Sequence, residues 1–159
     1  MREAKIGIRV ADVAQAIVFY QGLGFELAGT VPGPAGSPVL AVMVLDWFHL
    51  ILDALVGLPF PDTEREKMIK HGPRGLGCVI GIEVPDLEPI HLHCVQSGCE
   101  ITGPIQDQPW GERTFTCIDP HGYEWKFAVR TGEGNIKAVA AQWFGGNGDT
   151  PLISASARV

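Results

Sequence analysis

Charged side chains recur at alternate positions in several apolar, strand-like runs of this 159-residue chain. Side chains alternate between the two faces of a strand, so residues two or four apart share a face. Carboxylates, ammonium groups and an imidazole on a half-buried face can hold a polar ligand through charge-assisted hydrogen bonds. The candidates for this role are Lys5, Arg9, His49, Asp53, Glu83, Glu124 and Lys126.

The same charges can also satisfy one another without any ligand. In that alternative, Lys126 pairs with Glu83 or Asp53, and Arg9 pairs with Glu124. The sequence leaves the two interpretations open. The remaining histidines add no clear donor set, because His91 and His93 are two apart on a helical pattern and point to different sides. We expect solvated roles for these two and for His71 and His121.

The four cysteines have no spacing typical of a zinc site. Cys94 falls on a helical pattern, Cys78 and Cys117 fall on strand patterns, and Cys99 follows the predicted helix. No CxxC pair is present. We therefore expect reduced, buried thiols, as in a cytoplasmic protein.

Two stretches that repeat each other must position these side chains. Residues 6–27 and 80–101 align without a gap at a constant offset of 74, and an internal repeat of this kind indicates one structural unit used twice. The identical pairs are Ile6 and Ile80, Gly7 and Gly81, Ile8 and Ile82, Val10 and Val84, Asp12 and Asp86, Gly24 and Gly98, and Glu26 and Glu100.

Each copy has the pattern of a strand, a helix and a second strand. Alternating Ile and Val open each copy, Asp12 or Asp86 stands at a helix N-cap, and Gly24 or Gly98 follows the helix. Strand-like pairs at 39–45 and 48–53, and at 113–118 and 123–129, then follow the copies. The sequence thus predicts an α+β fold made of two βαβββ modules.

Turn-rich segments separate these units. We expect module one over residues 1–54, a linker over 55–76, module two over 77–129 and a tail over 130–159. The linker carries one or two helical turns capped by Asp62 or Thr63, and the tail carries a helix at 135–144 before a weakly ordered end. Residues 29–38 have the composition of a loop between two strands.

Composition limits the partners. The net charge of −6 and the absence of basic clusters argue against nucleic acid and fit a neutral or cationic small molecule. No apolar run is long enough to span a membrane and the N-terminus lacks a signal-peptide pattern, so we expect a cytoplasmic protein. One module alone would bury little core, so the modules should pack together or against a second chain.

The chain resembles the vicinal oxygen chelate superfamily, which includes glyoxalase I, bleomycin-resistance proteins and extradiol dioxygenases. The resemblance rests on the duplication, on DVAQAIVFYQGLGFEL and on QPWGERTFTCIDPHGYEWKF, and it is closest to the bleomycin-resistance branch. It implies strands curled into an incomplete barrel around a cavity, often completed by a second subunit, so we expect a homodimer. It also implies that Trp110 lines a binding groove, although a packed rim residue is the open alternative; Arg113 is either a ligand contact or a surface charge.

The metal-ligand positions that this resemblance implies are Lys5, Ile51, Val79 and Lys126. None of them is a His or carboxylate donor, which a divalent ion requires. A shift of two residues would bring in His49, Asp53, Glu83 or Glu124, but several strands would have to shift together. We expect no metal and no cofactor.

Two functions remain. The first is a metal-free binding protein that sequesters a small aromatic or cationic compound in a cleft. The alternative is a lyase, isomerase or dioxygenase of the same fold, which needs either three metal donors or an acid and base among Lys5, Glu83, Glu124 and Lys126. A scaffold whose cavity is filled by its own side chains is a third possibility.

Overall fold

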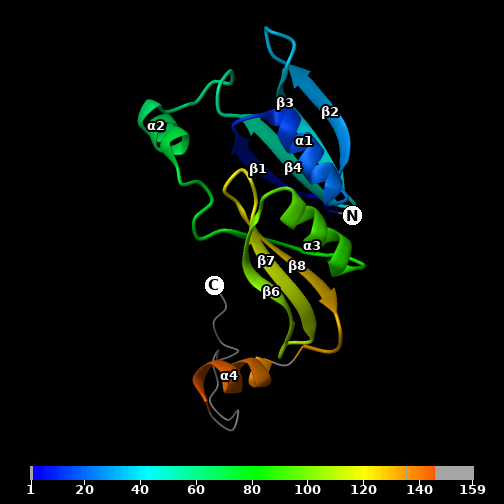
Figure 1. The fold of residues 1–159 in the computed structure, drawn as a ribbon. Coiled ribbons are helices and arrows are strands. Elements are labelled where there is room, and N and C mark those ends of the chain that lie inside the picture. Colours follow the sequence, from blue (N-terminus) through cyan, green and yellow to red (C-terminus); the bar gives the residue numbers. More distant parts are fainter. Residues whose placement is uncertain (1, 135, 146–159) are drawn as a thin grey trace.

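Two four-stranded sheets, each covered on one face by a helix, form the body of the protein (Figure 1). The computed structural model describes residues 2–134 and 136–145. Module one comprises β1 (Ala4–Val10), α1 (Val13–Gly22), β2 (Glu26–Pro32), β3 (Pro38–Leu45) and β4 (Phe48–Ala54). Module two comprises β5 (Val79–Glu83), α3 (Leu87–Gln96), β6 (Glu100–Gln108), β7 (Glu112–Ile118) and β8 (Glu124–Arg130). The predicted α+β fold of two βαβββ modules is confirmed.

The two sheets have the same strand order and do not close into a barrel. The orders are β1-β4-β3-β2 and β5-β8-β7-β6, and the first strand of each module runs parallel to the last. The other neighbours are antiparallel. Each helix packs on its own sheet, so one face of each sheet is covered and the other is left open.

Helices in the linker and the tail complete the fold. Helix α2 (Thr63–His71) lies to one side of the sheets, and α4 (Ile136–Phe144) lies beyond the far end of the second module (Figure 1). The Asp62 side chain accepts from the Arg65 amide at 2.7 Å, which confirms the predicted cap of α2. The prediction of a weakly ordered end falls on residues 146–159, outside the described residues. None of the described helices is both long and apolar enough to cross a membrane.

The helix boundaries of the repeat follow from its shared residues. Asp12 accepts from the Gln15 amide at 3.0 Å, and Asp86 accepts from the Glu88 amide at 3.1 Å, so both N-caps are confirmed. Gly24 and Gly98 have φ angles of 98° and 79°, a left-handed conformation that ends a helix at little cost only for glycine.

The predicted loop at residues 29–38 is wrong in its extent. β2 continues to Pro32 and β3 begins at Pro38, so the connection spans only residues 33–37. Glycine and proline suggested a loop, but β2 is an edge strand with a shift in register between Leu27 and Gly29. Edge strands and bulges tolerate both residue types.

The cysteines differ from the prediction at one position. All four are free; Cys94 and Cys117 are buried and Cys99 is half-buried, but Cys78 is exposed just before β5. The expectation of a buried thiol at Cys78 is therefore wrong. A strand-like neighbourhood did not reveal that the residue precedes the sheet.

A buried carboxylate joins the two modules. Asp119, which is 4% exposed, accepts hydrogen bonds from the Tyr20 hydroxyl of α1 at 2.5 Å and from the Trp125 indole of β8 at 2.8 Å. Its other oxygen accepts from the backbone amides of His121 and Tyr123. Burial, and then the neighbouring Asp119 charge, raises the pKa of Tyr20 well above 10.0, so the hydroxyl remains a neutral donor.

A second contact joins module two to the first strand. The Tyr123 hydroxyl donates to the Arg9 carbonyl at 2.7 Å and accepts from the Arg9 amide at 3.0 Å. Both backbone groups of an edge-strand residue are thereby satisfied by the other module. The hydrophobic core is accordingly continuous across the two modules.

Helices α1 and α3 meet through equivalent residues of the repeat. Phe19 and His93, which are related by the offset of 74, stack with ring centroids 5.2 Å apart, and the His93 Nε2 lies 2.9 Å from the Phe19 carbonyl oxygen. A Cβ at Gly22 would lie 2.1 Å from the His93 ring, so this close approach requires glycine.

Three of the four histidines expected to be solvated, His91, His93 and His121, are half-buried instead. His93 packs between the helices, and His121 is half-buried against Phe19 and Tyr20. His91 does point to a different side from His93, since its ring meets Phe115 edge-on. His71 is exposed.

Replacing Asp119 tests the joint between the modules. We expect Asp119→Ala to lower the free energy of unfolding by roughly 3–5 kcal/mol, because four donors lose their buried acceptor. Tyr20→Phe removes only one of these bonds and should cost about 1.5–3 kcal/mol. Urea denaturation of both variants measures the difference; equal costs would contradict the central role of the carboxylate.

Acid should destabilise the protein through His121. Burial lowers the pKa of His121 below 6.5 in the folded state, so the unfolded chain binds the proton first as the pH falls. Stability should therefore decrease as the pH drops below about 6.5, and level off below the folded-state pKa. Between pH 7.5 and pH 5.5 the free energy of unfolding of His121→Asn, measured by urea denaturation, should fall by less than that of the wild-type protein. An equal fall in both proteins would assign the pH dependence to other groups.

Candidate binding site on the open face of the second sheet

The open face of the second sheet carries the most organised polar cluster of the predicted site residues. Alternation places Gly81 and Glu83 of β5, Lys126 and Ala128 of β8, and Glu112 of β7 on the side away from α3. Together with Ile82 they line a cavity of about 220 Å³. The ladder pairs Gly81 with Lys126, and the missing side chain of the glycine leaves room beside the lysine.

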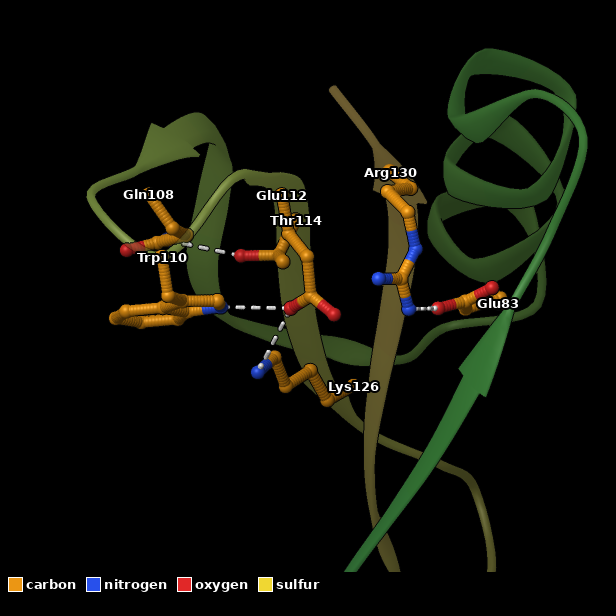
Figure 2. Close-up of polar contacts among 7 residues, drawn as sticks. All are labelled: Glu83, Gln108, Trp110, Glu112, Thr114, Lys126 and Arg130. Carbon is orange, nitrogen blue, oxygen red and sulfur yellow. Dashed lines mark hydrogen bonds and ion pairs between the residues drawn. The ribbon is translucent and has the colours of Figure 1, made fainter. Parts of the chain in front are cut away.

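Glu112 organises this face. Its Oε2 accepts from the Trp110 indole N–H at 2.6 Å and lies 3.4 Å from the Lys126 Nζ (Figure 2). The same Nζ stands 4.8 Å from the centroid of the Trp110 ring, within the range of a cation–π contact. Tryptophan, carboxylate and ammonium thus hold one another in place.

The turn that carries Trp110 folds over the sheet. The Gln108 amide donates to the Thr114 hydroxyl at 2.9 Å (Figure 2). Thr114 is only 3% exposed although it lies on the open face, because this turn covers it. The Trp110 ring also lies edge-on to the Trp143 ring of α4, with the ring centroids 6.4 Å apart. Helix α4 therefore extends the aromatic surface.

Glu83 belongs to a separate pair at the edge of the cavity. Its carboxylate lies 2.7 Å from the Arg130 guanidinium (Figure 2). The hydrogen bond to Glu83, and then the charge of Glu83, raises the pKa of Arg130 above its ordinary value. Both side chains are more than half exposed, so this pair adds little to stability.

The predicted residues of the first sheet lie apart from this cluster. Lys5 and His49 both approach the Glu3 carboxylate, at 3.7 and 3.5 Å. The Arg9 guanidinium donates to the Ala54 carbonyl at 2.9 Å and lies 4.0 Å from the centroid of the Phe60 ring.

Three further predicted residues lie outside the Trp110 cluster. Asp53 lies opposite Arg9 in the ladder, and its carboxylate borders Gly7. Glu124 lies opposite Val79, and Arg113 is exposed and paired with Asp107 at 3.3 Å.

The internal ion pairs considered as the ligand-free alternative do not form. Lys126 pairs with Glu112 rather than with Glu83 or Asp53, and Arg9 bonds to backbone carbonyls rather than to Glu124. Sequence reasoning missed Glu112 because the strand was expected to begin at residue 113. The available signal was its place in PWGER, two residues after Trp110 and on the same face as Thr114 and Thr116.

Other cavities are larger, and one of them adjoins the cluster. One of about 630 Å³ is lined by Trp47 and its neighbours at the β3–β4 turn and by Gly81, Ile82 and Glu83, which also line the smaller cavity. A third, of about 570 Å³, lies between Gly7 and Arg9 of β1 and the segment from Arg65 to Leu76. The equivalent glycines Gly7 and Gly81 thus border different cavities.

The residues of the open faces do not fit a divalent metal. At the implied positions, Lys126 carries an ammonium bound to Glu112, while Ile51 and Val79 offer no lone pair. The shifted set does not converge either. Within residues 2–134 and 136–145, the one group of three His, Cys, Asp or Glu donors lying within 4.8 Å of one another consists of cysteines elsewhere in the fold.

Comparisons with known proteins identify the family. Residues 4–127 match the model of the Glyoxalase/Bleomycin resistance protein/Dioxygenase superfamily, and the chain belongs to this superfamily. An uncharacterized protein of Mycobacterium bovis is 28% identical over 136 residues, which cover 83% of this chain and 86% of the relative.

Solved structures share the fold. TioX from Micromonospora sp. ML1 superposes with a TM-score of 0.61 at 20% identity, covering 82% of this chain and 99% of TioX. TnmS3, an antibiotic binding protein from Streptomyces sp. CB03234, has a TM-score of 0.56 at 19% identity, covering 82% of this chain and 96% of TnmS3. At these identities the likeness establishes the fold alone.

Removing Glu112 should loosen the cluster. We expect Glu112→Ala to lower the free energy of unfolding by about 1–3 kcal/mol, because the Trp110 indole and Lys126 both lose a partly buried partner. Glu83→Ala breaks an exposed pair and should cost no more than about 1 kcal/mol. Urea denaturation provides both values, and a larger cost for Glu83→Ala would contradict this assignment.

Proposed function

We propose that this protein binds a small aromatic or cationic compound at the open face of the second sheet and sequesters it without a metal ion or a reaction. The observation that carries the proposal is the half-buried Trp110 ring, fixed by Glu112 beside a cavity and covered by the ammonium of Lys126. An aromatic side chain with a few convergent polar groups at a hollow is the usual form of a small-molecule site.

The arrangement suits a ligand with a flat ring and a positive group. The ring stacks against Trp110, and Trp143, which is 63% exposed, widens the aromatic surface. The cation takes the place of the Lys126 ammonium over the indole and beside the Glu112 carboxylate. The net charge of −6 favours the approach of such a ligand.

A relative of the same fold supports this choice. TnmS3 is described as an antibiotic binding protein, and the PWG and DPHG motifs resemble the bleomycin-resistance branch. Membership of that branch, and a role in resistance within the cytoplasm, are parts of the proposal. An enzymatic role of the lyase, isomerase or dioxygenase type has no observation in its favour on these faces.

We include a homodimer in the proposal. The open face of the first sheet carries the half-exposed aliphatic side chains of Leu40, Val42, Val44 and Ile51. Covering this face with the second sheet of another copy would bury them and turn the open site into a cleft. Static light scattering tests the dimer independently of binding.

Calorimetric titration with a panel of planar aromatic and cationic compounds, including bleomycin, tests the binding function. We expect at least one compound to bind, and Trp110→Ala to weaken it by roughly threefold to tenfold, because an aromatic pair is worth about 0.5–1.5 kcal/mol. Leu92→Ala, which removes an exposed apolar side chain of α3 on the opposite side of the second sheet, is the control and should leave the affinity unchanged.

Two results would contradict the proposal. One is binding that disappears when a chelator is added, since no metal is expected to take part. The other is equal loss of affinity in the Leu92 and Trp110 variants, which would place the ligand away from the Glu112 cluster.

A further inference from the structure

Three cysteines of the second module meet beneath α3, on the opposite side of the sheet from the proposed ligand site. The Sγ atoms of Cys94 on α3, Cys99 just before β6 and Cys117 on β7 all lie within 4.8 Å of one another. The Cys117 thiol donates to the Cys94 sulfur at 3.9 Å. The Cys99 amide donates to the Cys94 carbonyl at 3.0 Å, and this turn brings the third sulfur to the other two.

The internal repeat relates the three cysteines to three core positions of the first module. At the offset of 74, the equivalents of Cys94, Cys99 and Cys117 are Tyr20, Phe25 and Met43. The ladders agree, since Leu27 pairs with Met43 as Ile101 pairs with Cys117. All three residues of the first module are buried in the core. The second module therefore carries a thiol at each of three positions where the first carries a larger buried side chain.

Coordination number and charge limit what three such sulfurs can bind. Thiolates select soft ions. A structural Zn²⁺ takes four donors, and only three converge here among the described residues. Cys94 and Cys117 are fully buried, and a site of this kind disfavours net charge. Three thiolates leave a net charge with a monovalent or divalent ion and none with a trivalent one.

We propose that Cys94, Cys99 and Cys117 form a binding site for a trivalent thiophilic metalloid of the arsenite type. With arsenous acid, three S–H bonds and three As–O bonds break and three As–S bonds form. Each thiol proton leaves with one hydroxide as water, and no oxidation state changes. The product is neutral, and the three sulfurs occupy one side of the arsenic.

Arsenous acid reaches the site first at Cys99. It is half-buried, whereas the other two thiols are closed to solvent. It lies two residues after Ser97, which lines a cavity of about 350 Å³ together with His93 and His121. The first As–S bond therefore forms at Cys99, and the buried thiols follow.

Titration of the reduced protein with sodium arsenite tests the site. We expect one arsenic per chain by native mass spectrometry, three sulfur neighbours by X-ray absorption, and an unfolding midpoint that rises with arsenite concentration. Cys78→Ser removes the exposed thiol outside the cluster and should retain all three results. Cys99→Ser leaves two thiols and should weaken arsenite binding by at least roughly a hundredfold.

The choice of Cys99 keeps the test free of folding defects, because this position is the least buried of the three; circular dichroism of both variants verifies the fold. Three results would overturn the proposal. They are no stoichiometric binding by the wild-type protein, unchanged affinity in Cys99→Ser, and Zn²⁺ binding tighter than arsenite, which would indicate a fourth donor.

Discussion

A single buried carboxylate ties the two modules of this protein to each other. Asp119 lies in the turn between β7 and β8, yet it binds the hydroxyl of a helix in the other module, the indole of its own sheet and two amides of its own turn. A buried charge is costly unless every lone pair is used, and here all four contacts are made. This fully satisfied group therefore fixes the relative placement of the modules together with the Tyr123–Arg9 contact and the shared core.

The open faces of the two sheets carry different side chains although the sheets have the same strand order. Ile51 and Lys126 occupy equivalent positions of the last strands, each opposite the glycine of its module. In the second module the lysine joins Glu112 and Trp110 in a polar and aromatic cluster. In the first module the equivalent position is Ile51 beside Val42, with His49 and Asp53 two residues to either side on the same strand face. The two open faces therefore differ at the position opposite the glycine, where one carries an ammonium group and the other an aliphatic side chain.

Local features of the chain were predictable because they depend on neighbouring residues. The caps at Asp12 and Asp86 and the glycines after the helices could be placed from the repeat alone. The partner of Lys126 could not, because Glu112 reaches it only after β7 and β8 pair. The convergence of Cys94 and Cys117 likewise depends on how α3 packs on β7. Arg9 is a third case, since its acceptor at Ala54 lies 45 residues away.

The stacked rings of Phe19 and His93 belong to equivalent positions of the two modules. Equivalent residues that touch each other mark a two-fold axis, the arrangement found between identical subunits. In a pair of identical half-length chains, any substitution at this point would occur on both sides at once. In a single chain the two positions are encoded separately, so one side carries a phenyl ring while the other carries an imidazole that bonds to the facing backbone. Duplication here allowed a symmetric contact to become a directional one.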